Sequence, residues 1–149
     1  MYNRHKIAGF ALFAITMALC YFTKLSYNDF APTAITIVSI SVAVYIAAMS
    51  ALLGSPYADK LKSVPDKKII GKTQLGVLTA YLRTAGSCGV LTIFISSLFL
   101  LPKTIPLPLQ FQKIISSLSY GVFTINLLFL WLIFQFFATA LINSAKPSK

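Results

Sequence analysis

Four long apolar runs constrain this chain more than any other feature of its sequence. They lie near residues 7–23, 34–54, 77–101 and 114–142, and the second run contains no charged residue. A transmembrane helix needs about 20 predominantly apolar residues to cross the hydrocarbon core of a bilayer. The pattern therefore predicts an all-α, polytopic membrane protein, with four transmembrane helices bundled in a single domain over residues 1–149.

The composition and the cysteines agree with a membrane-embedded chain. Of 149 residues, 57% are hydrophobic and 11% are charged, whereas a soluble domain has about 25% charged residues. The first run follows a short basic head, as in a signal peptide. Leu19 before Cys20 is too large for a lipoprotein cleavage site, so we expect this run to be the first transmembrane helix. Cys20 and Cys88 lie within apolar runs and are expected to pack as small side chains.

The connection between the second and third runs, residues 55–74, is rich in charge. Its five lysines are Lys60, Lys62, Lys67, Lys68 and Lys72. Pro56 and Pro65 bound a segment that we expect to be a short helix with Ser55 as its N-cap. Asp66 is expected to cap the next helix. The lysines of this loop are therefore candidate residues for binding a partner protein or lipid.

The distribution of positive charge predicts how the chain is oriented. Placing both termini with the 55–74 loop gives that side two basic residues from the N-terminal head, five from the loop and two from the tail, against three on the other side. The richer side is cytoplasmic, so both termini are predicted to be cytoplasmic, with the protein in the bacterial inner (plasma) membrane. Topology and anionic lipids explain the net charge of +10, so no direct contact with nucleic acid is expected.

Small residues recur at helical spacing in the second and third runs. Ala43 and Ala47 share one helix face, while Val38 lies on another face and is expected to meet lipid. Ala85 and Gly89 share a face of the third run. Small residues let transmembrane helices approach closely, so we interpret both stripes as helix-packing faces rather than a pore lining. Several such stripes also suggest a homo-oligomer.

Polar side chains within the apolar runs are candidate sites as well. Arg83 is expected to extend towards the cytoplasmic interface and to contact lipid or a partner. The alternative for Arg83 is a position facing the bundle interior or a water-filled cavity. Asn126 and Gln135 are expected to make hydrogen bonds between helices, within or between subunits. The three prolines between residues 102 and 108 predict an extended segment up to Lys113.

The titratable residues give little support to catalysis. His5 is the single histidine, and the three acidic residues, Asp29, Asp59 and Asp66, are dispersed along the chain. Metal sites need clustered ligands and acid–base catalysis needs positioned titratable groups, so we expect neither a metal, nor a cofactor, nor an enzyme. Residues 71–73 look like the end of a phosphate-binding loop, but the full motif requires a glycine where Asp66 stands.

Two main function classes remain. The first is a non-enzymatic, oligomeric scaffold or sensor that recruits a cytosolic protein through the basic loop. The second is a small oligomeric pore or holin-like channel, which would use Asn126, Gln135 or the serines and threonines as its lining. An accessory subunit of a larger transporter is a third alternative.

The size of the chain, its four predicted spans, its cytoplasmic termini and its Lys-rich stretch from Asp59 to Lys72 resemble a known family. They are similar to KwaA, the small membrane subunit of the two-gene Kiwa anti-phage defence system. This resemblance implies an oligomeric membrane sensor that engages a soluble, DNA-binding partner, KwaB. It carries over no functional residue.

Overall fold

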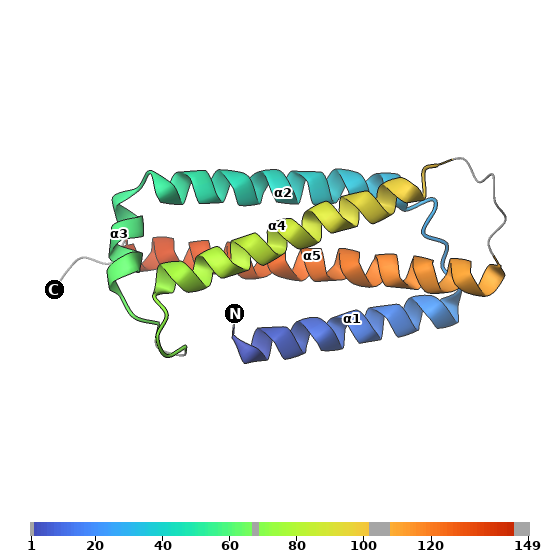
Figure 1. Cartoon of the computed structure of the whole chain (residues 1–149), viewed down its shortest axis with the longest axis horizontal. Helices are drawn as coiled ribbons and strands as arrows, with labels where there is room; N and C mark the ends of the chain where they lie inside the picture. The colour runs from blue at the N-terminus through green and yellow to red at the C-terminus, as the bar shows by residue number, and fades with distance from the viewer. Residues whose placement is uncertain (1, 67–68, 102–107, 145–149) are drawn as a thin grey trace.

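The computed structural model describes residues 2–66, 69–101 and 108–144 (Figure 1). Its helices are α1 (Asn3–Thr23), α2 (Ala31–Leu53), α3 (Pro56–Ser63), α4 (Gln74–Leu98) and α5 (Leu109–Ser144). All of these except α3 are long and apolar enough to cross a membrane. The chain is therefore a multi-pass α-helical membrane protein, and the predicted fold class is confirmed.

Each long helix begins a few residues before the apolar run that predicted it. The largest difference is in α5, which begins at Leu109, whereas the sequence predicted an extended segment through Lys113. That prediction was wrong for residues 109–113, because Pro108 stands directly before the helix, where a missing N–H breaks no helical hydrogen bond. Residues 102–107, with the other prolines, lie outside the described part of the chain.

The helix ends follow local chemistry, with two differences from expectation. The side chain of Thr73 accepts a hydrogen bond from the Gly76 N–H at 3.2 Å and so caps α4, the role expected of Asp66. Ser55 occupies the N-cap position of α3, but its hydroxyl donates to the Leu52 carbonyl at 3.0 Å instead of capping the new helix. Pro65 follows the end of α3 as predicted, because it cannot continue a helix.

The long helices are not equivalent in their packing. α4 and α5 pack together, α2 lies against both, and α1 contacts α5 along one flank of the molecule (Figure 1). Cys20 is the single buried residue that α1 contributes, whereas α4 is buried along much of one face. The described chain is therefore a packed group of three helices with a fourth at its side.

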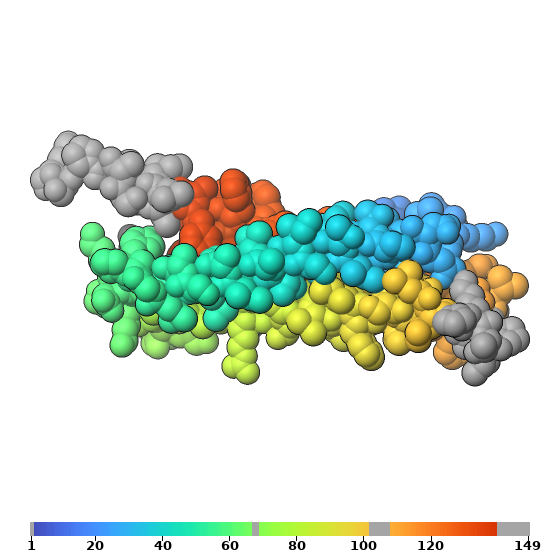
Figure 2. All heavy atoms as spheres, turned by 90° about the horizontal axis from the view of Figure 1, so that it is seen from above, coloured from blue at the N-terminus to red at the C-terminus, as the bar shows by residue number. Residues whose placement is uncertain are grey.

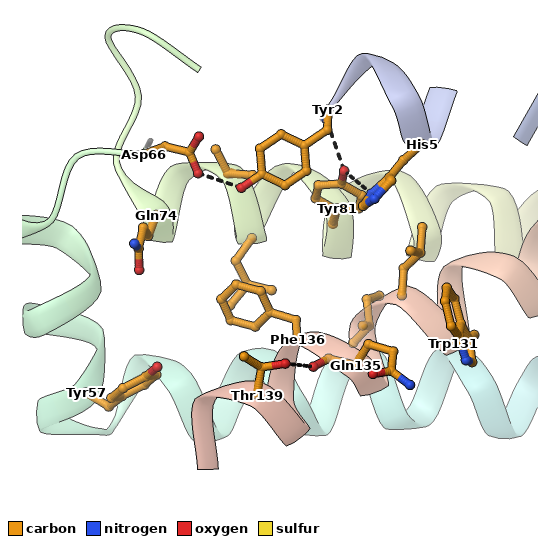
Figure 3. A pocket seen from close by; sticks show the side chains of 14 residues that line it. Tyr2, His5, Tyr57, Asp66, Gln74, Tyr81, Trp131, Gln135, Phe136 and Thr139 are labelled. Atoms are coloured by element: carbon orange, nitrogen blue, oxygen red, sulfur yellow. Dashed lines mark hydrogen bonds between the residues drawn. The ribbon is translucent and has the colours of Figure 1, made fainter. Parts of the chain in front are cut away.

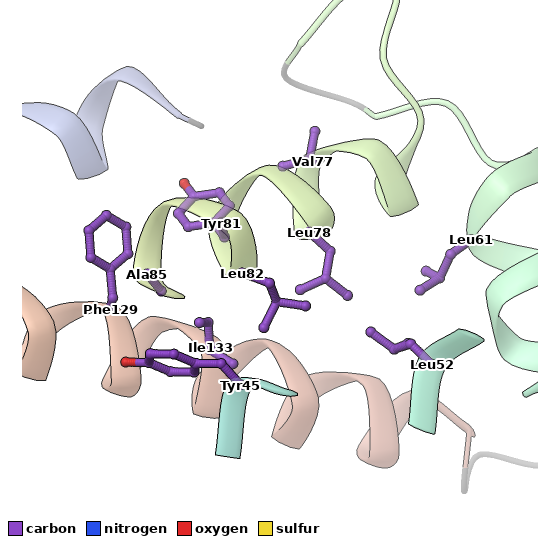
Figure 4. Packing of buried hydrophobic residues seen from close by; sticks show 10 residues of the cluster. All are labelled: Tyr45, Leu52, Leu61, Val77, Leu78, Tyr81, Leu82, Ala85, Phe129 and Ile133. Carbon is purple, nitrogen blue, oxygen red and sulfur yellow. The ribbon is translucent and has the colours of Figure 1, made fainter. Parts of the chain in front are cut away.

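α3 lies across one end of the bundle, beside the first turns of α4 (Figure 1). The two ends have separate apolar cores. Tyr45, Leu78 and Leu82 belong to the core beneath α3 (Figure 4). The core at the other end is centred on Tyr27, which is fully buried and whose ring centroid lies 4.9 Å from that of Tyr120. Both ends of the bundle are therefore fixed by packing.

The packing face of α2 differs from the prediction. Ala43 and Ala47 are exposed on the surface of the chain. Val38, which was expected to meet lipid, is fully buried, and so is Tyr45. The reason is that α4 supplies the small residues of this contact, so α2 can fill the space with larger side chains.

Ala85 and Gly89 are the residues of α4 that make this approach. Ala85 is fully buried, and Gly89 is buried beneath α2. A Cβ atom at Gly89 would collide with the Cγ2 atom of Val42. One stripe of small residues is enough for close contact of two helices, and in this bundle it belongs to α4.

Candidate functional site

α3 presents opposite faces to the bundle and to solvent. Leu61 is 4% exposed and packs into the core beneath α3 (Figure 4). Lys60 and Lys62, on either side of Leu61, are exposed. Asp59 lies in the first turn and the two lysines lie in the last, an arrangement that complements the helix dipole. Burial of Leu61 therefore holds Lys60 and Lys62 in fixed positions at the α3 end of the helix bundle.

The segment between α3 and α4 is a closed turn. The Gln74 N–H donates to the Val64 carbonyl at 3.0 Å, and the Asp66 N–H donates to the Lys72 carbonyl at 2.7 Å. Gly71 has a φ of +80°, a conformation that glycine adopts without the steric cost of a side chain. Lys72 lies exposed in the part of the turn that leads back into α4. Lys67 and Lys68 lie outside the described residues.

Asp66 joins this turn to the start of the chain. One carboxylate oxygen accepts a hydrogen bond from the Ile69 N–H at 2.7 Å, within the turn. The other accepts from the Tyr2 hydroxyl at 2.7 Å (Figure 3). Hydrogen bonds to a charged acceptor are stronger than neutral ones. Asp66 therefore ties the basic turn to the residue that precedes α1.

Tyr81 extends the same connection to α4. Its hydroxyl accepts a hydrogen bond from the Tyr2 N–H at 3.0 Å and lies 2.7 Å from Nδ1 of His5 (Figure 3). A hydroxyl that accepts from Tyr2 can still donate to a neutral imidazole. We call Tyr2, His5, Asp66 and Tyr81 the polar tie. It links the first turn of α1, the turn after α3 and α4.

The Tyr2 hydroxyl is a stable donor in this tie. Burial, followed by the hydrogen bond to Asp66 and the negative charge of that carboxylate, raises the pKa of Tyr2 to about 12. The ordinary value is 10.0. Tyr2 is therefore protonated throughout the physiological range and keeps its hydrogen bond to Asp66.

A cavity of about 610 Å³ lies beside the polar tie. Tyr2 and Tyr81 border it on one side, and Gln135, Phe136 and Thr139 of α5 border it on the other (Figure 3). Aromatic and apolar walls with a few polar groups are typical of sites that bind small molecules. The cavity opens at the same end of the molecule as α3.

His5 and Asp66, which border the cavity, both belong to the polar tie. Within residues 2–66, 69–101 and 108–144, no three His, Cys, Asp or Glu residues gather where they could hold a metal ion. The imidazole of His5 contacts a tyrosine hydroxyl, which holds its proton at neutral pH unless strongly perturbed. The polar tie therefore acts as a set of structural hydrogen bonds.

The remaining predicted residues lie elsewhere. Arg83 is exposed on the outer face of α4. Asn126 is buried between α5 and α4, and its amide donates to the Thr92 hydroxyl at 2.9 Å. Its side-chain oxygen Oδ1 has no hydrogen-bond partner among the described residues. Gln135 is exposed and borders the cavity, and its side chain makes no hydrogen bond to another helix among the described residues.

Sequence reasoning missed the polar tie and the cavity. His5 was noted only as the single histidine, and Tyr2, Tyr81 and Trp131 were assigned no role. One signal was present, because tyrosine and tryptophan are enriched where transmembrane helices meet the membrane interface. The hydrogen bonds of Tyr2 to Asp66 and to Tyr81 depend on tertiary structure.

No family model, no curated protein and no solved structure matches this chain.

Proposed function

We propose that this protein is a non-enzymatic, oligomeric scaffold or sensor of the bacterial inner membrane that recruits a cytosolic protein. The recruiting surface is α3 together with the turn that follows it, which we call the basic end surface. Its described lysines are Lys60, Lys62 and Lys72, all exposed.

The observation that carries this proposal is the folding of the basic stretch. A topology signal needs positive charge but no particular structure. Here Leu61 anchors α3 in the core and Asp66 fastens the turn to Tyr2. A surface that is already ordered loses less conformational entropy when a partner binds. The arrangement therefore favours protein recognition over a simple role in orientation.

The charge of this surface indicates the kind of partner. Lysines at the edge of an interface mainly accelerate encounter with an oppositely charged surface and make it sensitive to salt. We expect the partner to present an acidic face to the basic end surface. A role in anti-phage defence, implied by the resemblance to KwaA, is part of this proposal and predicts that loss of recruitment also removes protection against phage.

The pore alternative has less support from the described residues. Asn126 is buried against Thr92 within one chain and is not on an outer surface. Ser96 is likewise buried, with its hydroxyl 2.8 Å from that of Tyr27. Gln135 lies exposed, and so do some of the serines and threonines, such as Ser87. No observation favours an accessory subunit of a transporter.

The test is recovery of a partner from native membranes by crosslinking and co-purification. A variant with Lys60, Lys62, Lys67 and Lys68 changed to glutamine should lose the partner, while the wild-type complex should weaken as salt rises. The matched control changes Lys24 and Lys113, at the other end of the bundle, to glutamine and should retain the partner. A stable ion conductance in pure lipid, with no partner recovered, would favour the pore instead.

A further inference from the structure

An apolar groove runs along the outer surface between α2 and α4, which lie side by side (Figure 2). Its volume is about 740 Å³. Val42 and Ile46 line it from α2, and Val90 and Phe94 line it from α4. Because both helices are long enough to cross a membrane, the groove faces lipid rather than water.

One charged residue stands in this groove. Arg83 is the tenth residue of α4, so its Cα lies roughly 14 Å along the helix axis from Gln74. It is exposed, and it makes no hydrogen bond or ion pair with any other residue in the described part of the chain. A charge at this depth in a membrane is costly unless it is paired. A negative group from outside this chain would therefore stabilise Arg83 in the groove.

A second copy of the chain does not supply that group. The three acidic residues of the whole sequence are Asp29, Asp59 and Asp66. All three lie outside the four membrane-spanning helices. A neighbouring copy in the same orientation would bring another Arg83 to this depth, and like charges repel. The counter-ion is therefore a component of the membrane.

The order of groups along the groove matches a phospholipid. Along α4, Thr79 lies at the α3 end of the groove, Arg83 and Ser87 follow at intervals of one turn, and the apolar walls at Val90 and Phe94 lie deeper. Ser87 is exposed and its hydroxyl has no hydrogen-bond partner among the described residues. A Cβ atom at Gly86 would meet nothing within 4 Å, so open space lies beside Arg83. Phosphate, ester carbonyl and acyl chain succeed one another in the same order in a bilayer leaflet.

We propose that this groove binds one anionic phospholipid from the leaflet on the α3 side. Arg83 holds the phosphate, Ser87 donates to an ester carbonyl, and the groove beyond Val90 holds an acyl chain. The lining contains no carboxylate that would attract the ammonium group of a zwitterionic lipid. This site stands independently of the partner proposed for the basic end surface.

The test measures lipid binding to the purified full-length protein in detergent. Phosphatidylglycerol and phosphatidylcholine with identical acyl chains are titrated, and bound lipids are counted by native mass spectrometry. We expect one phosphatidylglycerol site that Arg83→Gln weakens about tenfold, equivalent to about 1.4 kcal/mol. Arg4→Gln, which removes the same charge outside the groove, should leave this site unchanged.

A second variant tests the contribution of the open groove to lipid binding separately from that of the Arg83 charge. Gly86→Leu keeps Arg83 but fills the open space, and it should also weaken phosphatidylglycerol binding while helix content is unchanged. Equal binding of both lipids, or an unchanged site in both Arg83→Gln and Gly86→Leu, would overturn the proposal. If Arg83→Gln instead alters only the oligomer size, the groove is an interface between copies of the chain.

Discussion

At the scale of single residues, Gly89 is a position where α4 and α2 leave no room for a side chain. A Cβ atom there would collide with Cγ2 of Val42, a β-branched side chain with little rotational freedom. Gly89→Ala should therefore destabilise the protein by about 1–3 kcal/mol, as overpacking does. Unfolding of the purified protein by denaturant in detergent would measure this loss.

Two matched variants control that prediction. Gly86→Ala, one turn earlier on the open side of α4, should be neutral or stabilising by up to about 1 kcal/mol, because alanine is the better helix former. Adding Val42→Ala to Gly89→Ala should recover part of the lost stability. Equal effects of Gly86→Ala and Gly89→Ala would show that the close contact is absent.

The raised pKa of Tyr2 predicts how its titration and the stability of the protein depend on pH. The tyrosinate absorbance that disappears in Tyr2→Phe should titrate near pH 12 rather than near 10.0, because burial and Asp66 favour the protonated form. The sign for stability follows from linkage. The unfolded chain releases this proton first, so stability from Tyr2 is complete below about pH 10 and falls as pH rises towards 12. Titration of Tyr2 near its ordinary value would mean that the polar tie does not form.

At the scale of elements, α3 is held to the bundle mainly by Leu61, with Tyr57 packed partly buried against the same core. Leu61 is its single buried residue. Leu61→Ala should cost about 2–5 kcal/mol of local docking energy, within the range for buried leucines. Proteolysis of the 55–74 stretch in the membrane-embedded protein should then become faster. Lys62→Ala, on the exposed face of the same helix, is the control and should leave the cleavage rate unchanged.

At the scale of the whole molecule, the testable property is orientation. In a background of Cys20→Ala and Cys88→Ala, Lys60→Cys should react with an impermeant thiol reagent only after the membrane is opened. Thr33→Cys, in the first turn of α2 at the opposite end, should react in intact cells. The expectation rests on the excess of lysine and arginine at the α3 end. Reaction of Lys60→Cys from outside would reverse the proposed orientation and remove the cytosolic partner surface.

The sequence by itself determined that the chain has four spans and that one connection is strongly basic. Hydropathy and charge are properties of each residue and act directly on the bilayer, so they can be read without knowledge of contacts. Pro56 and Pro65 also bounded α3 correctly, because proline acts on the backbone beside it. The spans, the basic connection and the bounds of α3 could be predicted because each depends only on residues that are close together in the sequence.

The tertiary structure alone decided which face of α2 packs and how the candidate site is assembled. Ala43 and Ala47 looked like a contact face, yet α2 packs through Val38 and Tyr45 because α4 provides the small residues. The hydrogen bond from Tyr2 to Asp66 joins residues 64 apart in sequence. No local pattern encodes such a contact, because it exists only after α1, α3 and α4 have come together at the same end of the bundle.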